Sequence, residues 1–528
     1  MRTYYAHLET LVPEVDKTLS AHPNFRSSAI FPIIKEPGLS VRLLFLGYWL
    51  LKRKIDHLTS VITLRSREGT PIARKILTIA EAKAYRIELS DLLQATNIPE
   101  NASFEGSLEI EFFSAENLVF PFPAVVINYY GDSFSSVVHT AQRVYNDYED
   151  MQKNSQTLVP ESGFNIYVNE VCEPFLGLIN GAFLKENAHI DLEFFNHKGQ
   201  TLTLKKELGT LKPYETIIIH PSDELDLRSF LDGQVGSCKA QFDVNWIFPR
   251  LLVGNKTTTP TALSITHTYY DCSNAASKGD YWNSPELDWH PATLMFPLFL
   301  AEDRFTNLYF YPIYSPSLLA IDVEFYTETG TLLATKKQEL VLKSPMQEYA
   351  VIHLTQLAKE LGCIASKGTL AVKVIARPLE DSLLPTRIKV GFDVGHENQG
   401  LPCNICMNLQ LFNPSLAAKP SSFKWLPILA DQPAPLLWLM NSSPHMNFNL
   451  TATVALTIFR EKDESILKRN LKILPNGFIT LSSSDDKEVA EFLKGTIGWA
   501  TAITNNGYLT TYYFADNPSG TIGGDHGF

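Results

Sequence analysis

Cysteine is scarce in this sequence, with six residues among 528. The six do not recur at matching places along the chain, so they do not form the disulfide framework that stabilises small secreted domains. Long apolar runs are also missing, because the longest, at residues 43–51, is too short to span a bilayer and is followed by three basic residues. We therefore expect no membrane span, and a reducing compartment is the simpler interpretation.

The N-terminus lacks the apolar core segment and the small-residue cleavage site of a Sec signal peptide. The expected compartment is unknown: cytoplasmic, or exported without a Sec leader. Basic residues are outnumbered, with 45 Lys and Arg against 57 Asp and Glu and a formal net charge of -12. No basic cluster with interleaved aromatic residues occurs, so we expect no nucleic-acid partner.

Motifs for nucleotide binding and hydrolysis are missing as well. The sequence contains no GxSxG, no GxxxxGK[ST], no GxGxxG after a strand and no HExxH. Because no nucleophile, base and orienting group can be assembled, we predict a protein that is not an enzyme and needs no cofactor. A hydrolase with its site at a domain junction is the least supported alternative.

An internal repeat of about 130 residues is what the sequence does contain. A turn glycine follows an alternating strand pattern at Gly69, Gly199 and Gly330, and Asp463 takes its place in a fourth copy. A second glycine precedes a later strand in every copy, at Gly106, Gly236, Gly368 and Gly495. Two independent markers with one period indicate four copies of one structural unit.

Each copy contains about seven short alternating segments separated by Gly, Pro, Asn and Asp, and no amphipathic helix of 12 or more residues. This pattern predicts antiparallel sandwiches. In architecture it resembles tandem immunoglobulin-like and fibronectin-like repeat proteins, although the inter-sheet cysteine pair and its packed tryptophan are missing. The predicted fold class is all-β, with four tandem seven-stranded antiparallel β-sandwich domains after a short N-terminal extension. The predicted bounds are 1–23 for an N-terminal arm or helix, and 24–148, 158–275, 286–410 and 421–528 for the repeats.

Polar connectors at 140–163, 270–291 and 397–422 separate the copies and are expected to pack on a neighbouring sandwich. The second connector concentrates aromatic residues. Tyr281, Trp282, Trp289 and His290, with His267 nearby, form a candidate ligand site, because aromatic faces beside carboxylates suit sugar rings. The same residues equally suit packing of the connector onto its domain, which is the favoured interpretation.

A histidine stands near the end of each copy, at His139, His267, His396 and His526. One ligand or metal contact per domain is the functional interpretation, and a structural histidine at the final turn is the favoured alternative. His396 also precedes Cys403 and Cys406, whose CxxC spacing makes the three a candidate metal set. Two unpaired loop thiols, or a local disulfide if the protein is exported, are the favoured alternative, because no further ligand pair is visible.

These patterns together favour a non-catalytic structural or protein-interaction scaffold that binds a protein partner or self-associates. A carbohydrate-binding multi-module protein, with a glycan held by the aromatic connector at 281–290, is the alternative. That alternative is based on fold-level analogy.

Overall fold

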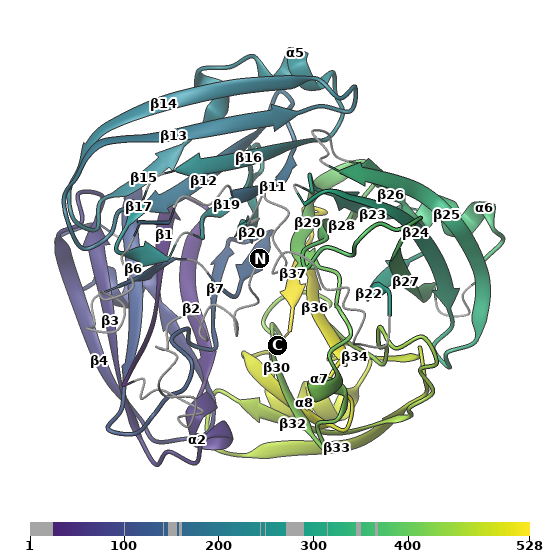
Figure 1. The fold of residues 1–528 in the computed structure, drawn as a ribbon. Coiled ribbons are helices and arrows are strands. Elements are labelled where there is room, and N and C mark those ends of the chain that lie inside the picture. Colours follow the sequence, from purple (N-terminus) through teal and green to yellow (C-terminus); the bar gives the residue numbers. More distant parts are fainter. Residues whose placement is uncertain are drawn as a thin grey trace, which may run out of the picture. The chain divides into compact units, whose positions relative to one another are not determined.

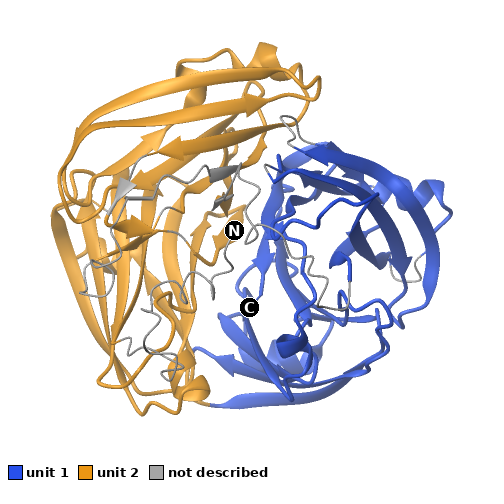
Figure 2. Cartoon of the chain, viewed as in Figure 1, with its two compact units in different colours: residues 1, 271–461, 465–528 blue, residues 2–270, 462–464 orange. Residues whose placement is uncertain are grey.

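The computed structural model describes residues 25–99, 101–140, 142–145, 156–157, 161–242, 244–248, 250–270, 290–301, 303–313, 315–344, 350–364 and 368–527. The predicted arm at 1–23 lies outside these residues. The chain forms two compact units (Figure 2). The N-terminal unit contains residues 2–270 with 462–464, and the C-terminal unit contains residues 271–461 with 465–528.

The N-terminal unit contains the first two copies, each built of two antiparallel sheets (Figure 1). The first copy has the strand orders β1-β6-β3-β4 and β5-β2-β7-β8. These strands are Arg26–Lys35, Phe104–Phe113, Leu58–Ser66 and Pro71–Ile79 in one sheet, and Ala84–Glu88, Ser40–Leu46, Val125–Tyr130 and Ser135–Val138 in the other. Two short helices, α2 (Tyr48–Lys52) and α3 (Leu89–Leu93), lie between strands.

The second copy has the strand orders β14-β13-β16-β11-β21 and β15-β12-β19-β20. The strands are Thr201–Leu211, Lys185–Phe195, Gly236–Phe242, Glu161–Ile166 and Tyr269–Tyr270, and then Thr216–Ile219, Cys172–Ile179, Leu252–Thr258 and Thr261–His267. The short strands β9 (Arg143–Val144) and β18 (Ile247–Phe248) pair with each other, as do β10 (Gln156–Thr157) and β17 (Val244–Asn245). A 3-10 turn (Pro221–Asp223) and α5 (Leu227–Leu231) precede β16.

The C-terminal unit repeats this plan twice (Figure 1). The third copy has the orders β22-β27-β24-β25 (Ala292–Phe299, Thr369–Pro378, Ser317–Tyr326, Leu332–Ser344) and β26-β23-β28-β29 (Ala350–His353, Arg304–Phe310, Lys389–His396, Gln399–Asn408). The fourth has β30-β35-β32-β33 (Ser422–Ile428, Gly498–Thr504, Ala452–Arg460, Ile466–Ile473) and β34-β31-β36-β37 (Phe478–Ser482, Leu436–Met440, Thr510–Asp516, Ile522–His526). The helices of the C-terminal unit are α6 (Leu354–Glu360), α7 (Pro414–Ala417) and α8 (Lys487–Leu493).

The prediction of an all-β chain of tandem antiparallel sandwiches is confirmed. Each copy has an eighth main strand that the prediction lacks, β8, β20, β29 or β37, and the second copy adds the two-residue strand β21. In the third copy this strand, Gln399–Asn408, falls inside the segment interpreted as a connector. Its Gly400 and Pro402 read as turn residues in the sequence, whereas in the structure the strand is the edge of a sheet, where such residues are tolerated.

The turn glycines occupy equivalent positions, as the period predicts. Gly69, Gly199 and Gly330 have φ values of +85°, +71° and +78°, and each ends the tight turn that follows β3, β13 or β24. A side chain is strained in this left-handed region, which explains why glycine recurs there. The N–H groups of these glycines donate to the carbonyl oxygen three residues earlier, at 3.0, 3.1 and 2.9 Å.

The second glycine marker is corrected in the C-terminal unit. Gly236 and Gly498 are the matching pair, since each begins the strand that follows a short helix, and a Cβ there would overlap the last leucine of that helix. Gly495 instead precedes the strand with a φ of +71° and matches Gly233, whose φ is +75°. Both matches are 262 residues apart, so the structure repeats most closely as a pair of sandwiches.

The two sandwiches of each unit meet at a joint that has the same geometry in both units. The turn at Gly69 lies on the turn at Pro213, and the turn at Gly330 lies on the turn at Pro475, with no room for a Cβ at either glycine. The N–H of Thr216 donates to the Arg67 carbonyl at 2.8 Å. The N–H of Phe478 donates to the Glu328 carbonyl at 3.1 Å, which is the same bond 261 or 262 residues later.

Apolar packing continues through each joint. Ile30 of β1 and Val144 of β9 belong to the apolar core of the second sandwich. In the C-terminal unit Trp438, Tyr512 and Phe514 of the fourth sandwich belong to the core of the third. Neither unit is therefore a pair of loosely linked domains, because separating its sandwiches would expose large apolar side chains to water.

The first connector takes part in the N-terminal joint, as predicted for connectors. The Ile30 N–H donates to the Gln142 carbonyl at 2.9 Å. The Gln142 side chain donates to the Ile179 carbonyl at 2.9 Å and accepts from the Ile179 N–H at 2.6 Å. This fully buried glutamine thereby links β1 of the first sandwich to β12 of the second.

Basic residues recur at one place in every copy, on β4, β14, β25 and β33, each the outer strand of its sheet: Arg74 and Lys75, Lys205 and Lys206, Lys336 and Lys337, and Lys468 and Arg469. At least one basic side chain per copy pairs with an acid, as in Lys75 with Asp91, Lys206 with Glu224, Lys337 with Asp322, and Arg469 with Glu488. Pairs in which both side chains reach solvent contribute about 0–1 kcal/mol. The pair of Lys337 with Asp322 differs, because Asp322 is buried. Basic edge strands therefore serve mainly to prevent edge-to-edge pairing between chains.

We expect Asp322→Asn to destabilise the C-terminal unit by about 2 kcal/mol at pH 7, because its carboxylate accepts charged hydrogen bonds. Arg377 donates to it through Nε at 2.7 Å and Nη2 at 3.1 Å, and the Gln338 N–H donates at 2.8 Å. Burial by itself raises the pKa of Asp322, but these bonds and the nearby Lys337 charge outweigh it, and the pKa is lowered overall.

A lowered pKa in the folded protein gives stability that is present above the unfolded value of about 4 and is lost as the pH falls through the folded value. Urea denaturation at pH 7 and pH 3 should therefore show a large difference between wild type and Asp322→Asn at pH 7 and a smaller one at pH 3. An equal difference at both pH values would contradict the assignment.

Candidate functional site

The predicted aromatic site is described only at His290, because Tyr281, Trp282 and Trp289 lie outside the described residues. The His290 ring lies 4.1 Å from the Phe412 ring and 4.6 Å from the His445 ring, centroid to centroid. Its Nδ1 accepts the Met446 N–H at 3.2 Å. His290 thus packs between the third connector and a loop of the fourth sandwich, which fits the packing interpretation of this residue.

The aromatic cluster of His290, Phe412 and His445 is half-buried and presents ring faces rather than ligand atoms. The Nδ1 of His445 accepts the Asn447 N–H at 3.2 Å, as that of His290 accepts a backbone N–H. A neutral imidazole that accepts at Nδ1 carries its proton on Nε2, so neither ring in this form offers an Nε2 lone pair to a metal. The cluster suits stacking against a ring, including a sugar ring.

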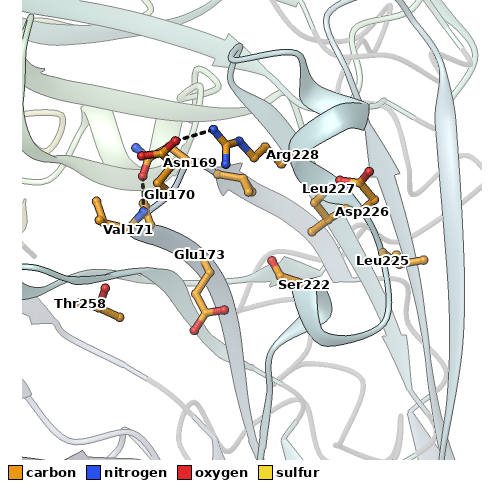
Figure 3. Close-up of a pocket in the computed structure, with 12 residues that line it drawn as sticks. Asn169, Glu170, Val171, Glu173, Ser222, Leu225, Asp226, Leu227, Arg228 and Thr258 are labelled. Atoms are coloured by element: carbon orange, nitrogen blue, oxygen red, sulfur yellow. Dashed lines mark hydrogen bonds and ion pairs between the residues drawn. The ribbon is translucent and has the colours of Figure 1, made fainter.

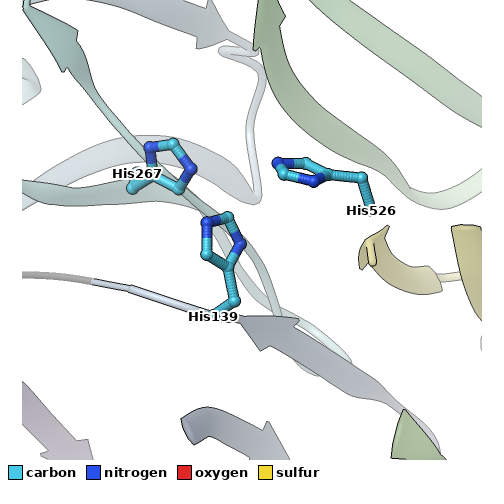
Figure 4. Close-up of side chains that lie close together, drawn as sticks. All are labelled: His139, His267 and His526. Carbon is cyan, nitrogen blue, oxygen red and sulfur yellow. The ribbon is translucent and has the colours of Figure 1, made fainter. Parts of the chain in front are cut away.

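His267 is buried and belongs to the N-terminal unit, whereas His290 belongs to the C-terminal unit. Its ring is 4.8 Å from that of His139 and nearly perpendicular to it, at 87° (Figure 4). His139 follows β8 of the first sandwich, and His267 ends β20 of the second. His267 Nδ1 is 3.0 Å from the Thr268 carbonyl oxygen.

The histidines that recur near the end of each copy occupy equivalent places in the fold in three copies only. His139 directly follows β8, and His267 and His526 end β20 and β37, the eighth strands of their copies, whereas His396 ends β28, the seventh strand of its copy. In that position His396 faces two carboxylates: its Nδ1 lies 2.9 Å from Asp303 Oδ2 and its Nε2 lies 3.1 Å from Asp516 Oδ1. The similar spacing of His396 therefore does not reflect an equivalent place in the fold.

The structure does not bring His396, Cys403 and Cys406 together as a metal set. Cys403 and Cys406 are three residues apart on the regular strand β29, so their side chains point to opposite faces of the sheet. Cys403 Sγ donates to the Gly524 carbonyl at 3.2 Å, and both thiols are buried. Burial, with nearby Asp525 and Asp393, raises the pKa of Cys403 well above its usual value. Two buried thiols in a strand replace the predicted loop thiols.

A pocket of about 360 Å³ lies at one end of the second sandwich (Figure 3). It is formed by residues 168–173, between β11 and β12, by residues 222–228, and by Thr258. Its ionisable groups are already engaged. Arg228 pairs with Glu170 at 3.0 Å, and His220 lies 3.3 Å from Glu173.

The remaining carboxylate of the pocket, Asp226, caps α5 by accepting the Ser229 N–H at 3.0 Å. Hydrogen bonds from Ser229 lower the pKa of Asp226. A glycosidase acid needs a raised pKa, so Asp226 is tuned in the opposite direction. The pocket is a surface recess with structural ion pairs in its wall.

Two loops that the sequence analysis did not single out are the best-defined exposed apolar surfaces beside the joints. The loop after β12 carries Phe183 and Leu184, which are 46% and 56% exposed. The loop after β31 carries Met446 and Leu450, which are 61% and 38% exposed. The first of these loops belongs to the second sandwich and the other belongs to the fourth, and the two loops occupy matching places there.

One buried asparagine anchors each of these loops. The amide of Asn180 donates to the carbonyls of Phe183, Leu211 and Lys212 at 2.8, 3.3 and 2.8 Å. The amide of Asn441 donates to those of Leu450, Ile473 and Leu474 at 2.8, 2.9 and 3.1 Å. The 261-residue spacing of these asparagines could have revealed them, but their role depends on carbonyls from distant strands. We call these segments the anchored loops.

No described helix is both long and apolar enough to cross a bilayer. No protein-family model matches the chain, and no curated protein matches it. Among solved structures it is similar to a tetra-tandem repeat from the extending region of a large adhesion protein, at 8% identity over 95% of this chain and 99% of that one, with a TM-score of 0.08.

It is also similar to a β-glucuronidase from Bacteroides uniformis, at 10% identity over 48% of this chain and 27% of that one, with a TM-score of 0.11. The FN1–FN3 domains of chicken CNTN1 match at 9% identity over 70% of this chain and 96% of that one, with a TM-score of 0.09. Scores this low assign the chain to no family and carry no argument about its function.

Proposed function

We propose that this protein is a non-catalytic scaffold that binds a protein partner through its two anchored loops. The predicted bounds of the four repeats stand as part of this proposal. The observation that carries it is the contrast between the joint, which recurs in both units, and the side-chain chemistry of the pocket in the second sandwich, which does not.

The joint repeats down to a single main-chain hydrogen bond, given by Thr216 in one unit and Phe478 in the other. The pocket of the second sandwich has no such counterpart. Alignment of the strand pairs places Ala434, Ser482 and Ala490 where the pocket has Glu173, His220 and Arg228. A shape that is kept while its side-chain chemistry changes supports a structural role.

The anchored loops are the part of this shape that suits binding. An exposed apolar surface held in place by buried hydrogen bonds loses little conformational entropy when a partner covers it. Two such loops on one chain allow bivalent binding, which strengthens attachment without any new contact. Exposed aromatic and methionine side chains such as Phe183 and Met446 are also enriched in protein interfaces.

Site-specific photo-crosslinking in cells tests this proposal. A photoreactive amino acid replaces Phe183 in one variant and Met446 in another, and the exposed Lys205 and Lys468 of the basic edge strands serve as control positions. We expect one adduct of the same mass from both loop positions and none from the controls. Adducts that are equally frequent at the control positions, or none at either loop, would count against the scaffold.

The aromatic cluster of His290, Phe412 and His445 supports carbohydrate binding as a second candidate function. Its half-exposed ring faces could stack on a sugar, and stacking of this kind typically contributes about 1 kcal/mol per ring. A glycan array with the full chain and with Phe412→Ala tests it. Binding by wild type that Phe412→Ala weakens would support the candidate, and no binding by wild type would remove it.

A further inference from the structure

His396 connects the two sandwiches of the C-terminal unit through both of its ring nitrogens. Asp303, which lies 2.9 Å from Nδ1, precedes β23 in the third sandwich. Asp516, which lies 3.1 Å from Nε2, ends β36 in the fourth sandwich. The His396 side chain is only 10% exposed, whereas its partners Asp303 and Asp516 are 59% and 30% exposed.

Both contacts require a proton on the imidazole. A carboxylate accepts hydrogen bonds and donates none, whereas a neutral imidazole has a single N–H. Only the imidazolium donates to Asp303 and Asp516 at once. After loss of one proton, a ring lone pair would face a carboxylate oxygen at hydrogen-bond distance, with no hydrogen between them.

The charges around the ring fit this requirement. Arg304, which pairs with His396 in the β23–β28 ladder, also forms an ion pair with Asp516. Two carboxylates therefore face one guanidinium and one imidazolium. Glu397 follows the histidine on the exposed hairpin turn. The residue that pairs with His396 in the ladder between β28 and β29 is the neutral Gln399. The His396 hydrogen bond lowers the pKa of Asp303, which keeps that carboxylate charged.

We propose that His396 is a proton-controlled fastening between the third and fourth sandwiches, which holds them together when the ring is charged and loosens when it loses a proton. This inference does not depend on the proposed scaffold function. It gives the C-terminal unit a joint whose strength falls as the pH rises through the titration of the ring.

The N-terminal unit provides an internal comparison. Strand alignment places Lys256 where the C-terminal unit has Asp516, and Lys256 Nζ lies 2.5 Å from Glu36 Oε1 of the first sandwich. An ammonium and a carboxylate both stay charged across the neutral range. The two units thus place different charged contacts at this aligned position, and of the two only the C-terminal contact contains an imidazole.

Cys403 reports on this joint, because its thiol bonds to the Gly524 carbonyl across the two sandwiches and is buried. The experiment measures the labelling rate of Cys403 by 4,4′-dithiodipyridine in the full chain, resolved by mass spectrometry. Dividing the rate in urea-unfolded protein by the rate in native protein at the same pH gives a protection factor free of thiol ionisation. Cys238, buried in the second sandwich, serves as the reference thiol.

We expect the protection factor of Cys403 to fall about tenfold from pH 5.5 to pH 8, the effect of losing a charged hydrogen bond. In His396→Gln it should be low and independent of pH. Asp303→Asn, at a side chain that is 59% exposed and so tolerant of substitution, should reduce the slope because a neutral ring then has only one carboxylate to satisfy. The protection of Cys238 should stay constant in all three proteins. A constant factor for Cys403 in wild type, or an unchanged slope in Asp303→Asn, would overturn the proposal.

Discussion

Gly69→Ala should destabilise the N-terminal unit by about 3 kcal/mol or more, a combination of left-handed strain and overpacking. At a φ of +85° any side chain is strained, and the added Cβ would overlap the Pro213 carbonyl oxygen of the next sandwich. Because both obstacles are backbone features, no rotamer change relieves them. Urea denaturation of the full chain, followed by tryptophan fluorescence and far-UV circular dichroism, measures the loss.

Gly38 offers a matched control within the same sandwich. Its φ is +81°, but nothing lies within 4 Å of a Cβ placed there. Gly38→Ala should therefore cost only the conformational strain, about 1–2 kcal/mol. If both variants lost the same stability, the turn at Gly69 would not be wedged against the second sandwich.

The C-terminal unit allows the same comparison independently. Gly330→Ala, at a φ of +78° and against the Pro475 carbonyl, should match Gly69→Ala in cost. Gly362→Ala, at a φ of +70° in open space, should match Gly38→Ala. Agreement between the units would show that the joint, not the individual sandwich, is the repeated structural element.

Asn441→Ala should also have a large effect, about 3 kcal/mol, because it leaves several buried polar groups unsatisfied. Three carbonyls lose the Asn441 amide, and the Asn506 amide loses its acceptor, Asn441 Oδ1, at 2.7 Å. Besides the lower stability, we expect faster proteolytic cleavage within residues 442–450. Native-state proteolysis read by mass spectrometry measures both.

Asn449 is the control for this substitution, since it is exposed and lies in the same loop. Asn449→Ala should change stability by less than about 0.5 kcal/mol, as surface substitutions usually do. Equal proteolysis of the two variants would contradict the role of Asn441 as the anchor. Asn180→Ala extends the test to the N-terminal unit, where the same loss is expected.

Pattern reasoning reached the sandwiches because their determinants are local. Alternation along β14 or β33 shows directly which side chains face the core, and a tight turn with positive φ shows directly as glycine at residues 69, 199 and 330. It missed the last strands where local signals were weak. β37 runs through Ile522–His526, where two glycines suggest a tail, but its pairing with β36 compensates for their poor strand propensity.

The candidate sites were less predictable, because spacing along a chain does not determine which face a residue occupies. The CxxC spacing of Cys403 and Cys406 suggests a chelate only if the backbone turns there, and an extended strand instead separates the two thiols. His396 and His267 stand at similar places in their sequence repeats. In the structure His267 ends the eighth strand of its copy, whereas His396 ends the seventh. The carboxylates that engage His396 come from residues 93 and 120 positions away.

The amino-acid sequence alone determined that this protein is a tandem array of antiparallel sandwiches, because hydrophobic alternation and turn chemistry act over a few residues. Only the tertiary structure decided that the sandwiches work in pairs, which loops stand exposed beside each joint, and which charges meet across it. Those features depend on contacts between residues more than 100 positions apart, such as Gly69 with Pro213 and Gly330 with Pro475. No local preference of the chain encodes them, because their energy exists only once both sandwiches have folded.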